Sequence, residues 1–174
     1  MRQGKHGPVP LIKYTRRLQN KFQRHLHGEG GFVLRPGRLP LTPRDGDVLL
    51  RGTIFCSGGL FMDVLERLVF VGPATDADAL IERRTYKYHL AIQSGALAYN
   101  IFRYDSPHAS PAEKGQPAYH YKHHKHCYDA AEKGIERKVV TFTSVDNTPT
   151  LYESLREAER WFYDHHELVR ELNR

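Results

Sequence analysis

The residues best suited to chemistry are histidines, and five of the eleven fall in one short segment. They are His108, His120, His123, His124 and His126, with Tyr119, Tyr121, Lys122 and Lys125 among them. Imidazole titrates near neutral pH, so one ring can accept a proton while another donates one, and a lysine can hold a phosphate. Cleavage of RNA needs such a set: a base for the 2′-hydroxyl, a cation for the phosphate and an acid for the leaving 5′-oxygen. We expect this chemistry at His108, His124 and His126, with neither metal nor cofactor.

Two other interpretations of the histidines remain open. His120, His123 and His124 could converge on a metal ion if the segment is helical, whereas His124 and His126 share a face if it is extended. The histidines could also be surface residues or hydrogen-bonded core groups. The local backbone geometry decides among these interpretations.

An arginine and an aspartate precede the histidine segment at the end of a predicted strand. Strand alternation places Arg103 and Asp105 on one face, near the histidines, and Phe102 in the core. The guanidinium fork can bind two phosphate oxygens, and a carboxylate can orient a histidine or a ligand. We expect both to be catalytic residues, although an Arg–Asp surface pair would explain them equally well.

Periodic patterns predict the elements that must position these residues. Apolar residues recur at spacings of three and four from Leu11 to Leu26, which predicts an amphipathic helix. Its other face is basic and carries Lys13, Arg16, Arg17, Lys21 and Arg24. A turn-rich stretch, 36–47, follows and is expected to be a loop.

Segments rich in β-branched and aromatic residues predict a run of antiparallel strands. These segments are 48–55, 60–71, 85–92, 97–104 and 139–143; the second would also suit a helix. The Gln93–Ala96 turn predicts a hairpin that puts Tyr86, Tyr88, Leu90 and Ile92 on one face and Lys87 and His89 on the other. The stretch 105–116 is expected to be a surface loop.

The C-terminal end predicts a long helix. Thr148 is expected to be its N-cap with Pro149 at the first helical position, and apolar residues repeat at helical spacing to Leu172. The expected fold class is α+β: an antiparallel β-sheet flanked by the N-terminal basic helix and this helix. We expect a single domain, 1–174, with a helical and loop extension at 1–45 and the sheet and C-terminal helix at 46–174.

Charge favours a polyanionic partner. The net charge is +6, and residues 1–45 hold ten Lys and Arg against Glu29 and Asp45. Nucleic acid, an anionic membrane surface or an acidic protein would fit, as would a solvated basic arm with no partner. The residues expected to bind RNA are Lys87, Tyr88, His89, Lys122, Lys125, Arg16, Arg17 and Lys21.

The composition also bears on the cellular compartment in which the protein is expected. Cys56 and Cys127 form no CxxC pair, so neither a disulfide framework nor a zinc finger is indicated. No apolar run approaches the roughly 20 residues that span a bilayer, and the N-terminus lacks the pattern of a secretory signal. We expect a soluble, cytoplasmic protein with no membrane partner.

Three short motifs resemble a known family. Tyr86–Leu90, Phe102–His108 and His123–His126 are similar to motifs of the small toxins of TumE-type toxin–antitoxin modules, over roughly residues 48–172. The N-terminal extension, the long loop after Asp105 and Ser106, where the family tends to have Asn, depart from the pattern. The resemblance implies a prokaryotic intracellular toxin that acts on RNA and is neutralised by a cognate antitoxin.

The leading hypothesis is therefore a toxin that is a metal-independent endoribonuclease. The alternatives are a non-catalytic nucleic-acid-binding protein and a metal-dependent nuclease with a histidine ligand cluster. The absence of a companion carboxylate motif such as HExxH weighs against the metal hypothesis.

Overall fold

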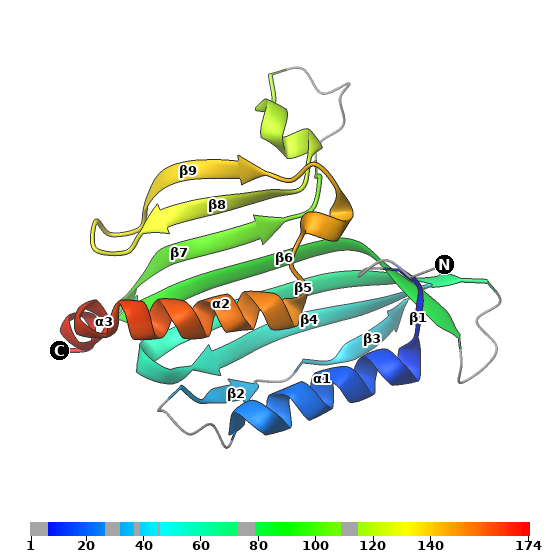
Figure 1. Cartoon of the computed structure of the whole chain (residues 1–174), viewed down its shortest axis with the longest axis horizontal. Helices are drawn as coiled ribbons and strands as arrows, with labels where there is room; N and C mark the ends of the chain where they lie inside the picture. Colours follow the sequence, from blue (N-terminus) through cyan, green and yellow to red (C-terminus); the bar gives the residue numbers. More distant parts are fainter. Residues whose placement is uncertain (1–6, 27–31, 37–38, 45, 73–78, 109–114) are drawn as a thin grey trace.

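The computed structural model describes residues 7–26, 32–36, 39–44, 46–72, 79–108 and 115–174. It has an α+β fold, as expected, built on a large antiparallel sheet (Figure 1). The central strand order is β2-β4-β5-β6-β7-β8-β9, while β1 pairs with β6 and β3 pairs with β4. Neighbours in the chain are neighbours in the sheet from β4 onward, so the sheet is a meander.

The strands have the following bounds. They are β1 (Val9–Pro10), β2 (Leu34–Pro36), β3 (Leu41–Arg44), β4 (Asp47–Cys56), β5 (Leu60–Val71), β6 (Leu80–Ser94), β7 (Leu97–Asp105), β8 (His124–Asp129) and β9 (Ile135–Thr141). Segment 60–71, whose sequence also suits a helix, is thus a strand, and the hairpin between β6 and β7 is confirmed. The expectation of a loop over 36–47 is wrong in part, because β3 pairs with β4 there.

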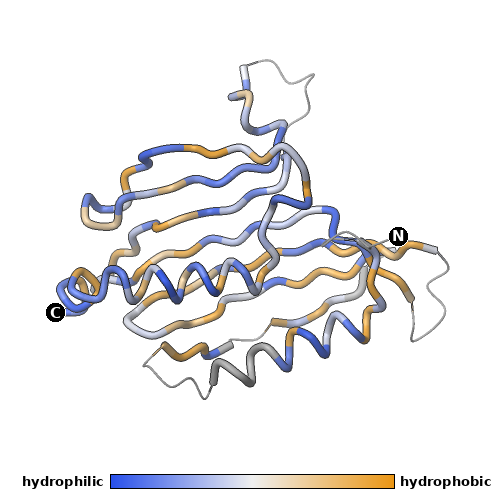
Figure 2. The backbone as a smooth tube through the Cα atoms, viewed as in Figure 1, coloured by the Kyte–Doolittle hydropathy of each residue, from blue (hydrophilic) through white to orange (hydrophobic). Residues whose placement is uncertain are grey.

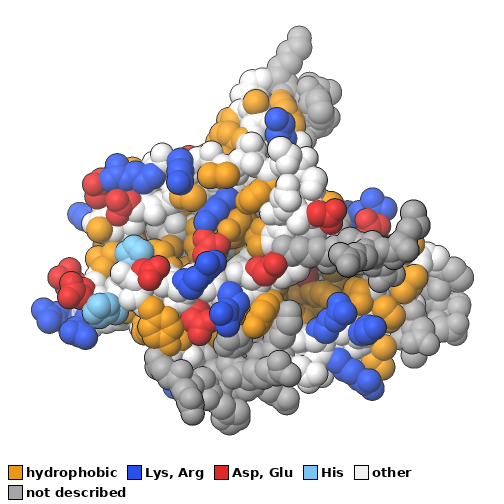
Figure 3. Space-filling model, in the orientation of Figure 1, with side chains coloured by type: hydrophobic (Ala, Val, Ile, Leu, Met, Phe, Trp, Pro, Cys, Tyr) orange, Lys and Arg blue, Asp and Glu red, His pale blue; other side chains and the backbone are white. Residues whose placement is uncertain are grey.

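Helices pack on one face of the sheet, in front of it in Figure 1. They are α1 (Leu11–Leu26), α2 (Leu151–Asp164) and α3 (His166–Leu172). Three short 3-10 turns lie elsewhere in the chain: η1 (Ser57–Gly59) between β4 and β5, η2 (Ala118–Tyr121) before β8, and η3 (Val145–Asn147) between β9 and α2. The bounds of α1 match the sequence prediction. Acidic and basic side chains are interspersed over α2 on this side of the molecule (Figure 3).

The start of the C-terminal helix differs from the sequence prediction. Its N-cap is Thr150, not Thr148, and Thr150 and Glu153 form a reciprocal capping box. Thr148 is instead fully buried and accepts a hydrogen bond from Arg83. The helical region is also divided at His165, where α2 ends and α3 begins.

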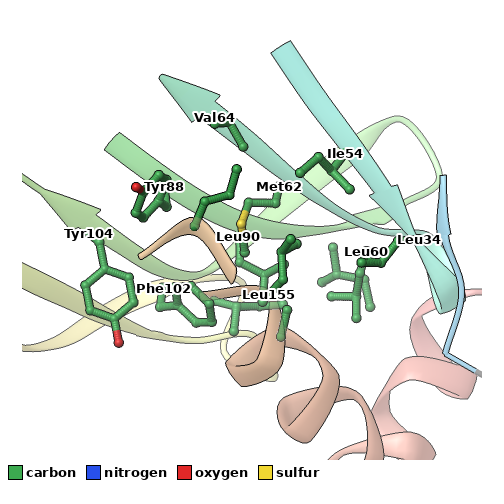
Figure 4. Packing of buried hydrophobic residues seen from close by; sticks show 14 of the residues in the cluster. Leu34, Ile54, Leu60, Met62, Val64, Tyr88, Leu90, Phe102, Tyr104 and Leu155 are labelled. Carbon is green, nitrogen blue, oxygen red and sulfur yellow. The ribbon is translucent and has the colours of Figure 1, made fainter. Parts of the chain in front are cut away.

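The core lies between the sheet and the helices. Hydrophobic and polar residues alternate along the central strands (Figure 2), so one face of each strand is apolar. In Figure 4, Met62, Tyr88, Leu90 and Phe102 from the sheet lie close to Leu155 of α2. The face assigned to Tyr88 and Leu90 in the predicted hairpin is therefore confirmed as the buried one.

A buried polar network ties the helices to this face. Glu66 of β5 is 2% exposed and accepts hydrogen bonds from the hydroxyls of Tyr14 in α1 and Tyr88 in β6. Arg83 donates to Tyr88 at 2.8 Å and to the carbonyl of Pro149, just before α2, at 2.8 Å. Both helices are thus anchored through one ion pair in the interior.

A glycine sets the turn between β8 and β9. Gly134 has φ +74, and a Cβ there would lie 2.8 Å from the backbone nitrogen of Asn100 in β7. The positive φ and the close approach both favour glycine at this position. The turn can therefore pack directly against β7.

Candidate active site

The predicted site residues meet where β7 ends and β8 begins. Arg103 pairs with His126, and Asp105 pairs with His124, across these two antiparallel strands. Directly opposed residues project from the same face, so all four side chains lie together. This face is opposite to the one that α2 covers, because Tyr104 and Lys125, which alternate with them, both contact Glu157 of α2.

His124 is held in one tautomer. Its ring is fully buried, and Nδ1 donates to the carbonyl oxygen of Lys122 at 2.8 Å. The lone pair is consequently on Nε2, which lies 3.7 Å from Oδ2 of Asp105. Among the described residues, Nε2 of His124 has no hydrogen-bond partner.

The ring of His126 is fixed by contacts at both nitrogens. Nδ1 donates to Oε2 of Glu136 at 2.5 Å, and Nε2 lies 3.0 Å from Nη2 of Arg103. A guanidinium can only donate, so Nε2 of His126 must be the acceptor. Glu136 thus orients the ring much as a carboxylate orients a catalytic histidine.

A β-bulge brings Glu136 to this position. The register shifts between Cys127 and Tyr128, so that Tyr128 opposes Glu136 rather than Arg137. Without the bulge, the strict alternation of β9 would place Arg137 on the histidine face. The irregularity therefore exchanges a cation for a carboxylate beside His126.

Arg103 and Asp105 form the charged part of the site. Nε of Arg103 donates to Oδ2 of Asp105 at 2.6 Å, and the same oxygen lies 3.6 Å from Nε2 of His126. Asp105 is 8% exposed at its side chain, whereas Arg103 is 28% exposed. A ligand from solvent can therefore reach the guanidinium more readily than the carboxylate.

Two further histidines and a tyrosine stand over His124. The ring centroid of His108 lies 4.4 Å from that of His120 and 5.3 Å from that of His124. Tyr119 of η2 contacts the rings of His120, His124 and His126. The η2 turn thus covers the paired histidines of β8.

Burial lowers the pKa of two histidines of the site. Desolvation lowers the pKa of His124, with the nearby Asp105 carboxylate and the Lys122 carbonyl acting in the opposite direction. The pKa of His120 is also lowered, first by desolvation and then by the neighbouring rings of His108 and His126. The lowered pKa favours the neutral form of these two rings, whose lone pair can bind a cation.

The structure places the other residues predicted to bind RNA on both faces of the sheet. Lys87 and His89 are on the same face as Asp105 and Arg103, which they oppose across β6 and β7. Tyr88 cannot touch a substrate, because it is fully buried on the opposite face. Lys125 is also on that face, where it pairs with Glu157 rather than with a ligand.

Among the remaining predicted residues, Lys122 adjoins the cluster through its carbonyl oxygen, whereas Arg16 and Arg17 lie away from it. Lys122 is exposed beside η2, and His123 stacks on Tyr86 with a centroid distance of 5.7 Å. Arg16 and Arg17 are exposed on α1, which lies near β2 and β3, far from β8 (Figure 1). The side chain of Lys21 lies outside the described residues, as does the stretch 109–114 of the predicted loop.

Sequence reasoning missed three residues of this site. The catalytic set predicted from the sequence leaves out His120, although it lies in the histidine segment, and leaves out Tyr119 and Glu136. No local pattern identifies Glu136, because its position depends on the pairing and bulge of β8 and β9. His120 can be identified from the close spacing of the histidines in the sequence.

The structure changes which residues could bind a metal ion. The helical arrangement of His120, His123 and His124 does not occur, because β8 is extended and His123 points elsewhere. Two other groups have potential ligand atoms within 4.8 Å of one another: His108, His120 and His124, and Asp105, His124 and His126. The site can thus exchange protons, hold an anion at Arg103, or bind a cation.

Comparisons with known proteins give no relatives for this chain. No family model, no curated protein and no solved structure matches it. In the part of the chain that the structure describes, no helix is long and apolar enough to cross a membrane. Function must therefore be argued from the site.

Proposed function

We propose that this chain is an endoribonuclease, the toxin of a toxin–antitoxin module that acts on RNA in the cytoplasm. The observation that carries the proposal is the meeting of two buried histidines, His124 and His126, with the Arg103–Asp105 pair. A ribonuclease that uses the 2′-hydroxyl needs neutral imidazole beside a phosphate-binding cation.

The proton transfers follow from the tautomers. The RNA phosphate binds Arg103 and takes the hydrogen bond that the guanidinium gives to His126. Nε2 of His126 is thereby freed and accepts the proton of the 2′-hydroxyl. The 2′-oxygen bonds to phosphorus as the bond to the 5′-oxygen breaks, and the leaving 5′-oxygen takes a proton from the exposed ring of His108, which lies over the buried His124. The products are a 2′,3′-cyclic phosphate and a free 5′-hydroxyl.

The open face of the sheet offers a path for the RNA strand. Lys87 is exposed next to Asp105, and His89 lies beside Arg103. Arg51 of β4 is also exposed on this face, because it alternates with the buried Leu50. In this proposal Lys87 and Arg51 contact phosphates without reading base sequence.

The toxin role is supported by the resemblance to TumE-type toxins. Two of its motifs, Phe102–His108 and His123–His126, supply Arg103, Asp105, His108, His124 and His126 of this site. Expression of the chain should arrest growth of a bacterial host, and the His126→Ala variant should relieve the arrest. A short antitoxin gene beside this one would support the same role.

The decisive experiment is cleavage of a labelled RNA by the purified chain. His126→Ala should lower the rate by about 10²–10⁴-fold while RNA binding survives. His166→Ala is the matched control, because His166 is an exposed histidine outside the cluster. A substrate with 2′-deoxyribose at the scissile position should resist cleavage.

Two outcomes would reject the proposal. Equal cleavage of the deoxy substrate would exclude the 2′-hydroxyl as nucleophile. Salt-sensitive RNA binding with no cleavage by the wild-type chain would favour the alternative of a non-catalytic nucleic-acid-binding protein.

A further inference from the structure

Three histidines of the cluster have their lone pairs on the same ring atom. Nδ1 of His124 donates to the Lys122 carbonyl, Nδ1 of His108 lies 3.2 Å from the Ser106 carbonyl oxygen, and Nδ1 of His120 lies 3.0 Å from Oε1 of Gln116. Each of these oxygens can only accept, so each Nδ1 carries the proton. Metal-binding histidines have this arrangement, with one nitrogen tied to an oxygen and the other free.

His124 leaves this lone pair buried and unused. Its side chain is fully buried, and Nε2 is without a hydrogen-bond partner among the described residues. A buried polar atom with no partner is destabilising, and such atoms in native proteins call for an explanation. A bound cation would supply the missing partner.

The spacing of the rings fits one ion. Two imidazoles on one tetrahedral zinc ion have centroids about 5 Å apart, because the Zn–N distance is about 2.0–2.1 Å. The observed distances are 4.4 Å for His108 and His120, 5.3 Å for His108 and His124, and 5.7 Å for His120 and His124. One potential ligand atom from each ring lies within 4.8 Å of the others.

The other possible ligand group is already occupied. Oδ2 of Asp105 and Nε2 of His126 both accept hydrogen bonds from Arg103, at 2.6 and 3.0 Å. An ion there would have to displace a guanidinium. The three-histidine group requires no such displacement.

We propose that His108, His120 and His124 bind a divalent ion of the zinc class, with an open coordination position beside Asp105 and Arg103. Neutral imidazole suits zinc, copper, nickel and cobalt rather than magnesium or calcium. Three histidines with a fourth position left open are typical of catalytic zinc rather than structural zinc.

The catalytic consequence rests on the proposed ribonuclease function, whereas ion binding does not. With an ion on Nε2, His108 no longer donates a proton. His126 still takes the proton of the 2′-hydroxyl, and the ion stabilises the leaving 5′-oxygen as the bond to phosphorus breaks. That oxygen then takes a proton from water, so the products are unchanged.

The test is a zinc titration of the full chain after treatment with a chelator, followed by calorimetry. We expect one ion per chain, and cobalt(II) should give the visible absorption of a tetrahedral site. His120→Ala should weaken binding more than about 100-fold, beyond the loss caused by removing an outer-shell partner. His126→Ala should bind zinc as the wild type does, and His166→Ala serves as the surface control.

Each result has one meaning. Failure of the wild-type chain to bind zinc, or equal binding by His120→Ala, overturns the metal site. If zinc binds at these residues and RNA is never cut, the metal site stands and the ribonuclease function fails. If the chelated, zinc-free chain cuts RNA at full rate, the ion has no catalytic role.

Discussion

Every histidine of the cluster is oriented by an oxygen atom on its Nδ1 side. The acceptors differ: two backbone carbonyls, the amide of Gln116 and the carboxylate of Glu136. Only the last carries a charge, so His126 differs from the other rings in its electrostatic surroundings. This difference fits the role proposed for His126, in which the ring becomes positively charged when it accepts a proton.

Removal of the Glu136 carboxylate should disturb the orientation of His126 without changing the stability of the fold. Glu136→Ala should lower cleavage by about tenfold or more, because the imidazolium of His126 loses its orienting and stabilising partner. Glu132→Ala, which removes an exposed carboxylate of the same hairpin, is the control. Thermal unfolding of both variants should match the wild type. Unchanged cleavage by Glu136→Ala would remove His126 from the mechanism.

Neighbouring residues of β7 should give opposite phenotypes. Phe102 is 3% exposed in the core, so Phe102→Ala should lower the free energy of unfolding by about 3–5 kcal/mol. Arg103 is on the other face, so Arg103→Ala should mainly lower the cleavage rate. Denaturant unfolding and RNA cleavage measure the two effects. An Arg103→Ala variant with normal activity per folded molecule would exclude this residue as the phosphate ligand.

At the scale of elements, β7 and β8 position the site while α1 and α2 stabilise the opposite face. The link to the helices is the buried pair of Arg83 and Glu66, whose nearest charged atoms are 4.0 Å apart. Removing one member of such a pair leaves an uncompensated charge in the interior.

Arg83→Met should therefore destabilise the fold without touching the site. We expect a loss of about 3–5 kcal/mol in the free energy of unfolding, measured with urea, because Glu66 would stay buried without its cation. Arg84→Met is the control, since Arg84 is the exposed neighbour in the same strand. Equal stability of the two variants would mean that the Tyr14 and Tyr88 hydroxyls suffice to hold Glu66.

The sequence predicts the central elements well because their alternation is strong. The α1 helix and the β6–β7 hairpin follow from apolar spacing alone, and the hairpin places Arg103 and Asp105 on one face. Strand β8 lacks this signal, since its histidines and lysine show no apolar alternation. Its extended form comes from pairing with β7 and β9.

Two errors have identifiable physical causes. Thr148-Pro149 resembles an N-cap followed by a helix-starting proline. In the structure, however, Thr148 accepts a hydrogen bond from Arg83, which is 65 positions away in sequence. The true signal was Thr150 with Glu153 three residues later, a capping box. Glu136 could not be found at all, because a bulge in a strand pair sets which residue of β9 faces His126.

For the molecule as a whole, the two faces of the sheet have different tasks. The helix-covered face holds the apolar core, and the open face holds the cluster together with Lys87 and His89. Histidines occur near both faces, and burial shifts the pKa of several of them in the same direction. Desolvation lowers the pKa of His89, His123 and His124.

Stability should consequently fall in mild acid. In the unfolded chain these histidines titrate near the usual value of about 6.5, while the folded chain resists their protonation. Below that pH the unfolded state binds more protons, so the free energy of unfolding decreases as pH falls from 7 toward 5. His89→Asn should flatten this dependence, and His166→Ala should not. Stability that rises on acidification would show that the nearby carboxylates dominate.

Gly134 is a position outside the candidate site at which a substitution should nevertheless damage the site. Because a side chain there would collide with the backbone of Asn100, any substitution must push the β8–β9 turn away from β7. The displacement would pass along β8 to His124 and His126, whose positions depend on the pairing of β8 with β7 and β9. In a population under selection to escape this activity, inactivating mutations should therefore recur at Gly134 in chains whose histidines are all intact.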